Sequence, residues 1–278
     1  MKDHLIQVVS AARLDDRRNV AREYLQLYVL RLLHELGLST KWAFCGGTAL
    51  RVLYALPRFS EDLDFSVVHS DEDRDTTIGG EVPALKRELE RAGYRVNFKV
   101  KEANSVHSAM IRFEGILADC QIVPDPRLAL SIKVEIDTKP PPGFHITTTL
   151  IQRYFPIALV HHELPSLFAG KLHAILTRGH VKGRDWYDLV WYLTEQRGIE
   201  PNVIFLRNAL RQTGGNESFA ENWRGAAAAR CRDLDWNAVR RDVSPFLVRQ
   251  NDLDQMNPEL VLELIRSSAT GPSRAGQV

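Results

Sequence analysis

The beginning of the chain has apolar residues at helical spacing. Within residues 1–38 they recur at intervals of three or four, as in Leu25, Val29, Leu32 and Leu36. This spacing is that of one helix face, so residues 1–38 are expected to be largely helical, with Gly37 at a helix end. A short apolar piece, 42–45, precedes Gly46 and Gly47, and a helix pattern over 48–56 is stopped by Pro57.

The middle of the chain alternates apolar and polar residues, which predicts strands with one buried face. The alternation is clearest in SEDLDFSVV (60–68) and SIKVEIDT (131–138). Further strands are expected at YRVNFKV (94–100), AMIRFEG (109–115) and LADCQIV (117–123). An amphipathic helix is expected over 81–92, ended by Gly93, and the polar stretch 69–80 predicts a loop.

From Pro165 onward the pattern becomes helical. Helices are predicted at about 165–178, 184–196, 201–213, 216–231, 236–249 and 257–268. The chain is therefore expected to be α+β, with a mixed sheet and flanking helices over 1–160 and a helical domain over 161–270. The tail, 271–278, is expected to be frayed.

Composition narrows the functional classes. The 278 residues contain 36 basic and 35 acidic side chains, so the net charge of +1 gives no global attraction to nucleic acid. No apolar run approaches the roughly 20 residues of a membrane span, and the charged start does not resemble a signal peptide. A cytoplasmic protein without membrane association is expected. The three cysteines are far apart, which argues against a disulfide framework or a zinc site.

The segment FCGGTALRVLYALPRFSEDLDFSVV (44–68) carries the chemistry. Gly46 and Gly47 precede a helix, where backbone N–H groups and the helix N-terminus favour a phosphate. Arg58 and Ser60 follow the helix and can reach an anion. A glycine pair before a helix is usually only a turn, so this signal is weak by itself.

A pair of carboxylates follows on a predicted strand. Asp62 and Asp64 are two residues apart, so their side chains share one face of the strand. Oxygen ligands of this kind suit Mg²⁺ or Mn²⁺, which usually also takes substrate phosphate oxygens. A third carboxylate is available on 131–138, where Glu135 and Asp137 have the same phase. Glu135 is the preferred third metal ligand, and Asp137 is the alternative to it. Each acid alone would read as a solvated strand face.

In combination, these motifs resemble a known family. GGTAL, a helix and RFSEDLDF look like the first motif of DNA polymerase β-type nucleotidyltransferases. More narrowly, the chain is similar to the AbiEii-type toxins of AbiE toxin–antitoxin pairs, a group that includes the MenT toxins. LPSLFAGKLHAILTR and KGRDWYDLVWYL resemble the later motifs of that family. The superfamily often has serine after the first motif glycine, where this chain has Gly47.

The resemblance implies an NTP-dependent, pyrophosphate-releasing nucleotidyltransferase that uses Mg²⁺ or Mn²⁺. Asp62 and Asp64 would hold the metal and carry catalysis together with Lys171 and Asp185, and Lys171 would also contact a phosphate. Nucleotide binding would fall to Gly46, Gly47, Thr48, Arg58 and Ser60. The implied acceptor is RNA, specifically the 3′ end of tRNA, and the implied partner is a separately encoded antitoxin. A protein hydroxyl acceptor and a non-catalytic NTP- or RNA-binding module are the alternatives.

Several residues in the second half also have structural interpretations. Lys171 lies on an apolar helix stripe, where it either extends to the surface or points into a cleft. Asp185 and Asp188 lie three apart at a helix start, where either could merely favour the helix dipole. Core packing is the default for the aromatic cluster Trp186, Tyr187, Trp191 and Tyr192. The eight arginines of 201–250 predict either an RNA-docking surface or a solvated, salt-bridged face.

Overall fold

The computed structural model describes residues 1–68 and 78–267, and the chain forms two compact units. The first, the sheet unit, comprises Met1–Ala55, Phe59–Pro140 and Ile146–His161. The second, the helical unit, comprises Leu56–Arg58, Pro141–His145 and the chain from His162 onward. The expected tail over 271–278 lies outside the described residues, as does the expected loop over 69–80 except for its last three residues.

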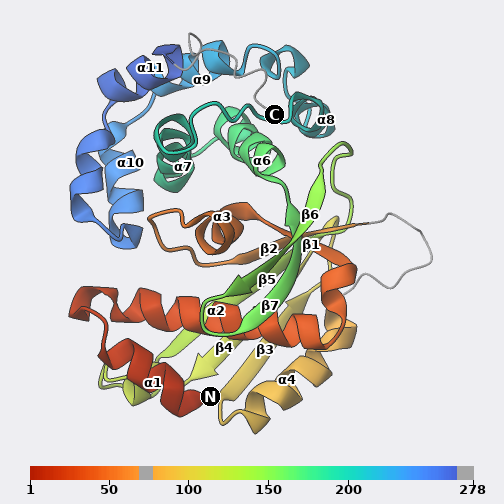
Figure 1. Cartoon of the computed structure of the whole chain (residues 1–278), viewed down its shortest axis with the longest axis vertical. Helices are drawn as coiled ribbons and strands as arrows, with labels where there is room; N and C mark the ends of the chain where they lie inside the picture. The colour runs from red at the N-terminus through yellow and green to blue at the C-terminus, as the bar shows by residue number, and fades with distance from the viewer. Residues whose placement is uncertain (69–77, 268–278) are drawn as a thin grey trace, which may run out of the picture. The chain divides into compact units, whose positions relative to one another are not determined.

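Within the described residues, the sheet unit contains one seven-stranded mixed sheet of order β3-β4-β5-β2-β1-β7-β6 (Figure 1). Its strands are β1 (Trp42–Cys45), β2 (Leu63–Val67), β3 (Arg95–Lys101), β4 (Val106–Glu114), β5 (Ala129–Asp137), β6 (Ile146–Gln152) and β7 (Pro156–His162). The sheet with flanking helices, followed by a helical unit, confirms the expected α+β fold class.

The central strands bring distant parts of the sequence together. β2 pairs with β1 in antiparallel fashion and with β5 in parallel fashion. Along β5, apolar side chains are buried at every second position, at Leu130, Ile132, Val134 and Ile136. The polar positions between them therefore share the opposite face of the sheet, as the alternation in the sequence predicts.

The helices of the sheet unit are α1 (Lys2–Ser10), α2 (Arg17–Glu35), α3 (Gly46–Tyr54), α4 (Val82–Arg91) and the single turn α5 (Ile116–Asp119). α2 packs on β5, with α1 and α4 beside it (Figure 1). α3 packs instead on β1, β2 and β6. The predicted helices over 1–38, 48–56 and 81–92 are confirmed in type, with ends shifted by a few residues.

The strand predicted over 117–123 is wrong. Residues Ile116–Asp119 form a helical turn after Gly115, which has φ +71°. Ile116 and Leu117 are buried from this turn, so the apolar side chains that suggested a strand face reach the core without one. A short apolar run does not distinguish a buried strand from a buried helical turn.

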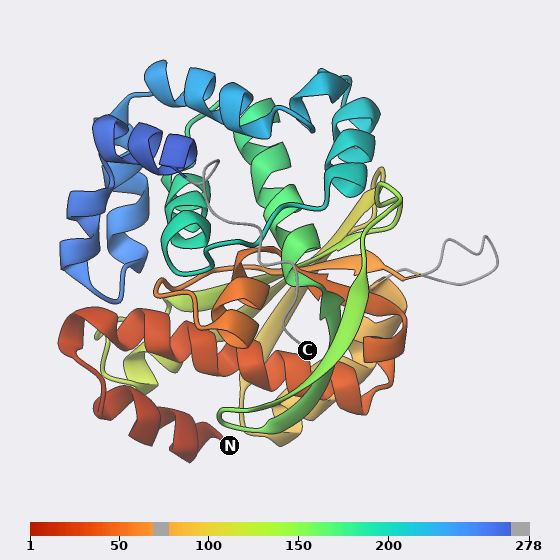
Figure 2. The same ribbon diagram turned by 45° about the horizontal axis from the view of Figure 1, so that its top comes forward.

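The strands β6 and β7 were not predicted, and they form a long ribbon at one edge of the sheet (Figure 2). β6 is exposed at every residue except Ile151, so its sequence lacks the alternation of a half-buried strand. Edge pairing rather than burial of one face therefore defines this strand.

The helical unit contains α6 (Leu164–Thr177), α7 (Gly183–Thr194), α8 (Val203–Gln212), α9 (Trp223–Arg232), α10 (Trp236–Val243) and α11 (Pro258–Ser267). α9 begins later than predicted because the Asn222 side chain caps it by accepting from the Gly225 N–H. α10 ends early, just before Pro245, which cannot continue a helix.

Aromatic packing stabilises the helical unit. The Phe168 ring of α6 stacks on the Tyr192 ring of α7, with centroids 4.1 Å apart, and Trp223 of α9 packs edge-on against Phe168. Trp186 and Tyr187 are also buried, which confirms core packing for the α7 aromatic cluster. Across residues 1–68 and 78–267, no helix combines the length and hydropathy that a bilayer crossing requires.

Candidate active site

The glycine pair lies where β1 ends and α3 begins. Gly46 is the first residue of α3 and has φ +76°, in the left-handed region that favours glycine. A Cβ atom at Gly46 would overlap with the Asp64 carboxylate and lie 2.9 Å from the Asp64 Cβ atom. The absence of a side chain therefore lets the N-terminus of α3 approach the carboxylate face of β2, and the first N–H groups of a helix have no partner within it.

The acids form a row across two neighbouring strands. Asp64 on β2 is the register partner of Glu135 on β5, and Asp62 immediately precedes β2 with the same phase as Asp64. Asp137 pairs instead with Ser66, two residues further along both strands. The register therefore favours Glu135 over Asp137 as the third carboxylate beside the glycine pair.

Lys133 lies in this acid row, and sequence reasoning assigned it no role. Its Nζ atom is 2.7 Å from the Glu135 Oε1 atom. The hydrogen bond to Glu135 raises the pKa of Lys133, and the charges of Asp62 and Asp64 act in the same direction. The ammonium thus offsets part of the repulsion among three carboxylates, where a metal cation would do the same. The sequence could have indicated this place for Lys133, because Lys133 lies two residues from Glu135 and so on the same face of β5.

The donor set of this row fits a hard divalent cation, because every candidate ligand is a carboxylate oxygen. Within the described part of the chain, no group of three or more His, Cys, Asp or Glu side chains is close enough together to form a complete metal cage. Mg²⁺ is commonly held by only one or two carboxylates, with phosphate and water oxygens completing its shell. Asp62 and Asp64 satisfy that requirement.

Thr48 and Ser60 have protein partners here. The buried Thr48 hydroxyl donates to the Asp62 backbone carbonyl, and this hydrogen bond ties α3 to the acid segment. The Ser60 carbonyl accepts a 3.2 Å hydrogen bond from the buried Gln26 side chain of α2. These contacts favour a positioning role for Thr48, whereas the Ser60 hydroxyl contributes nothing to its contact with α2.

Side chains of α2 contact both α3 and the acid segment that precedes β2. Its buried Glu23 carboxylate pairs with Arg51 of α3 at 2.6 Å and with Arg153 at 2.6 Å. Arg22, also on α2, lies 3.4 Å from Glu61 in the acid segment. Together with Gln26, these side chains fix α3 and residues 60–61 to one rigid helix. No local sequence pattern indicates these contacts, because the partners are 28 or more positions away.

The helical unit contains a second charged cluster, formed by Arg58, Lys171, Arg178, Asp185 and Asp188. Arg58 makes a two-pronged pair with Asp188, with both N–O distances 2.6 Å. Lys171 lies 2.8 Å from Asp188 and 3.0 Å from Asp185. Arg178 reaches Asp185 at 2.5 Å. Three cations thus surround two carboxylates, in a buried network that carries excess positive charge.

Arg58 is 1% exposed, and its fork faces Asp188. Burial alone would lower the pKa of Arg58, but the Asp188 charge and hydrogen bond outweigh it and raise the pKa. This placement gives no support to the expected direct contact of Arg58 with a triphosphate. It favours a positioning role, because the pair anchors the segment after α3 to α7.

Asp185 and Asp188 are both buried, and both hold Lys171. Burial pushes the pKa of Asp185 upward, but the charges of Lys171 and Arg178 dominate and lower it. A carboxylate with a lowered pKa is a weak base, so the geometry favours orientation of Lys171 over proton abstraction. The Lys171 side chain is 13% exposed, and its ammonium pairs with both buried carboxylates.

Most arginines of 201–250 have partners. Arg211 pairs with Glu217 at 2.7 Å, and Arg207 and Arg224 pair with Glu221 and Glu200. This pattern favours a solvated, salt-bridged face for α8 and its neighbours over an open docking surface for RNA.

A family model and solved structures of other proteins resemble this chain. The sequence model of the AbiEii nucleotidyl transferase toxins of type IV toxin–antitoxin systems matches residues 29–263. The crystal structure of a proposed nucleotidyltransferase from Helicobacter pylori is similar in fold, with TM-score 0.51, 18% identity, and coverage of 89% of this chain and 92% of that one. Another Helicobacter pylori protein, JHP933, gives TM-score 0.46 and 18% identity, covering 90% of this chain and 94% of its own. No curated protein sequence matches the chain.

Proposed function

Because the chain belongs to the AbiEii nucleotidyltransferase toxin family, we propose that it transfers a nucleoside monophosphate from an NTP to the 3′ end of tRNA. The protein is a nucleotidyltransferase, and its type IV family implies a separately encoded antitoxin. The family generally uses an NTP and a divalent metal. The acceptor, and Mg²⁺ or Mn²⁺ as the ion, are parts of this proposal.

One observation carries the proposal. Gly46 brings the first turn of α3 against the Asp64 carboxylate, and the strand register places Glu135 beside Asp64. Phosphate-binding backbone groups and metal-binding oxygens are therefore neighbours, as phosphoryl transfer requires. A glycine turn or a pair of strand acids alone would not supply both.

The residues would share the work as follows. Asp62 and Asp64, with Glu135 beside them, would hold the metal, which when bound supplies Lewis-acid polarisation of phosphate oxygens. The N–H groups of Gly46 and Gly47 would bind the triphosphate, and Lys171 would neutralise a phosphate charge. Asp185 and Asp188 would keep the Lys171 ammonium in place. The acceptor hydroxyl would attack the α-phosphorus and release its proton to solvent water, while the bond to pyrophosphate breaks and pyrophosphate leaves.

The test is an Asp64→Asn variant, which keeps the side-chain volume and removes the charge. Transfer of label from an α-³²P-labelled NTP panel to total tRNA should fall by more than about 100-fold, because even outer-shell partners of a metal cost 10–100-fold when removed. Asp137→Asn is the matched control, since Asp137 has the same strand phase but pairs with Ser66. It should retain transfer.

Undiminished transfer by Asp64→Asn, with the thermal unfolding midpoint unchanged, would refute the metal assignment. Label on protein instead of RNA would move the acceptor to a protein hydroxyl. Measurable NTP binding by the wild type without label on any acceptor would support the alternative of a non-catalytic module.

A further inference from the structure

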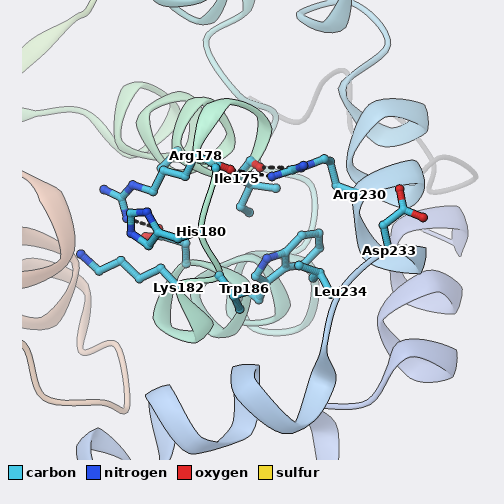
Figure 3. A pocket seen from close by; sticks show the side chains of 12 residues that line it. Ile175, Arg178, His180, Lys182, Trp186, Arg230, Asp233 and Leu234 are labelled. Carbon is cyan, nitrogen blue, oxygen red and sulfur yellow. Dashed lines mark hydrogen bonds and ion pairs between the residues drawn. The ribbon is translucent and has the colours of Figure 1, made fainter.

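A pocket of about 130 Å³ opens in the helical unit where α6 ends and α7 begins (Figure 3). Its walls come from the end of α6, the connection 178–182, the first turn of α7 and residues 230–234. A cavity needs roughly 10–15 Å³ of this measure to hold one water molecule. The pocket therefore has room for a small polyatomic ion together with bound water.

Basic side chains outnumber acidic ones in the pocket lining. Arg178, His180, Lys182 and Arg230 contribute to it, against the two acids Asp185 and Asp233. Figure 3 shows the polar ends of the Arg178, His180 and Lys182 side chains gathered on one side of the pocket, away from Asp233. A lysine ammonium, an imidazole and a planar guanidinium therefore line the same side of the pocket in this view.

One of the two acids is already neutralised. Asp185 accepts from Lys171 at 3.0 Å and from Arg178 at 2.5 Å, so two cations share its charge. Arg230 is held differently, because it donates to the backbone carbonyls of Ile175 at 3.4 Å and Arg178 at 2.6 Å. These contacts fix the connection after α6 and leave a net positive charge at the pocket.

Lys182 stands out within this cluster. Its side chain is half-buried, and it forms no ion pair with any residue of 1–68 and 78–267. Burial lowers the pKa of Lys182, and the nearby charges of Arg178, Arg184 and Lys171 add to this against the opposing charge of Asp185. A partly desolvated ammonium beside other cations is unfavourable unless an anion joins it.

Some cations elsewhere in the helical unit have acidic partners. On α8, Arg207 and Arg211 have glutamate partners. The His180 ring, by contrast, is exposed and makes no hydrogen bond within the described residues. Lys182 and His180 thus bring two side chains without a hydrogen-bond or ion-pair partner among the described residues to one pocket.

We propose that this pocket binds a phosphate group through Arg178, His180 and Lys182. A guanidinium fork and a lysine point charge together match the oxygens of a tetrahedral, multiply charged anion better than a single planar carboxylate. The phosphate comes either from the backbone of an RNA acceptor or from a free nucleotide. The pocket lies wholly within the helical unit, and a phosphate site there goes beyond the proposed transfer reaction.

The experiment measures binding by full-length protein in EDTA, where no transfer can proceed. Two probes are used, a labelled single-stranded RNA oligonucleotide and ATP. Lys182→Ala should raise the Kd for at least one probe about tenfold, since hydrogen bonds to charged groups are among the stronger ones. If RNA is the source, the slope of log K against log salt should also fall by about 0.7, the value for one phosphate contact on a single strand.

Arg232→Ala is the matched control, because this exposed arginine neighbours Asp233 in sequence but does not line the pocket. It should bind both probes like the wild type. His180→Ala, at an exposed position, is the second variant in case Lys182→Ala fails to fold, and it should weaken binding in the same direction. Weakened RNA binding alone assigns the phosphate to RNA, and weakened ATP binding alone assigns it to the nucleotide.

Equal Kd values for the wild type and the pocket variants with both probes, or no binding of either probe by the wild type, would overturn the proposal. The two proposals are tested separately, because label transfer by Asp64→Asn with metal present tests the reaction, whereas probe binding by the Lys182 and His180 variants in EDTA tests the pocket. A failure of the pocket hypothesis therefore leaves the transfer hypothesis standing, and the reverse also holds.

Discussion

At the scale of single residues, Gly46 connects backbone conformation to chemistry. Two independent requirements meet at this position, a φ of +76° and the space occupied by the Asp64 carboxylate. Gly37 also has φ +76°, but a Cβ atom added there would meet nothing within 4 Å. A side chain at Gly37 would therefore cost only the unfavourable backbone conformation. A side chain at Gly46 would cost this and also the clash with Asp64.

Gly46→Ala should abolish label transfer and destabilise the protein by more than Gly37→Ala does. A left-handed conformation costs an L-residue about 1–2 kcal/mol, and both variants carry that cost. Only Gly46→Ala also displaces Asp64. The measurements are the thermal unfolding midpoint and label transfer for both variants, and equal transfer by the two would contradict the importance of the close approach.

At the scale of elements, α2 acts as the frame of the site. Glu23 and Gln26 reach α3 and the acid segment from one helix, so the glycine pair and the carboxylates keep a fixed spacing. The chemistry therefore rests on a helix that contributes no expected ligand. Rigid support of this kind is a general requirement of sites that must hold oxygens within fractions of an ångström.

Glu23→Gln should destabilise the protein by about 3 kcal/mol, because breaking a buried ion pair leaves charges without compensation. Glu35→Gln is the control on the same helix, since Glu35 pairs with Arg31 at the surface. It should change stability by less than about 1 kcal/mol. Chemical denaturation of both variants tests this, and similar losses would show that the Glu23 network adds no more than a surface pair.

At the scale of the whole molecule, charge is nearly balanced overall and concentrated locally. Although the net charge is only +1, the sheet unit contains a row of acids and the helical unit contains a network with more cations than carboxylates. Burial makes the second network sensitive to protonation. Asp185 has a lowered pKa in the folded protein, so its ionisation stabilises the fold at neutral pH.

The stability contributed by Asp185 should be fully present above its unfolded-state pKa of about 3.9 and be lost as pH falls toward the lower folded value. Asp185→Asn should therefore lower the thermal midpoint at pH 7, and the difference from wild type should shrink below about pH 3.9. Thermal unfolding of both proteins from pH 7 to pH 3 measures this. A difference that stays constant or grows toward low pH would contradict it.

Local patterns in the sequence determined the main helices and strands and indicated the family. The period of apolar residues predicted β2, β5, α6 and α7, because burial of one face imposes that period on strands and helices. The glycine pair, the strand phase of Asp62 and Asp64, and the later Lys and Asp motifs indicated the nucleotidyltransferase family. These features are short-range, so a single sequence contains them.

Only the tertiary structure decided which distant charges meet. Arg58 lies 130 positions from Asp188, and nothing near either residue indicates that the two are buried together. The place of Lys133 among the acids, the pairing of Asp64 with Glu135, and the pocket around Lys182 likewise depend on strand register and helix packing. Burial and partner set the charge chemistry of a side chain, and both are properties of the folded chain.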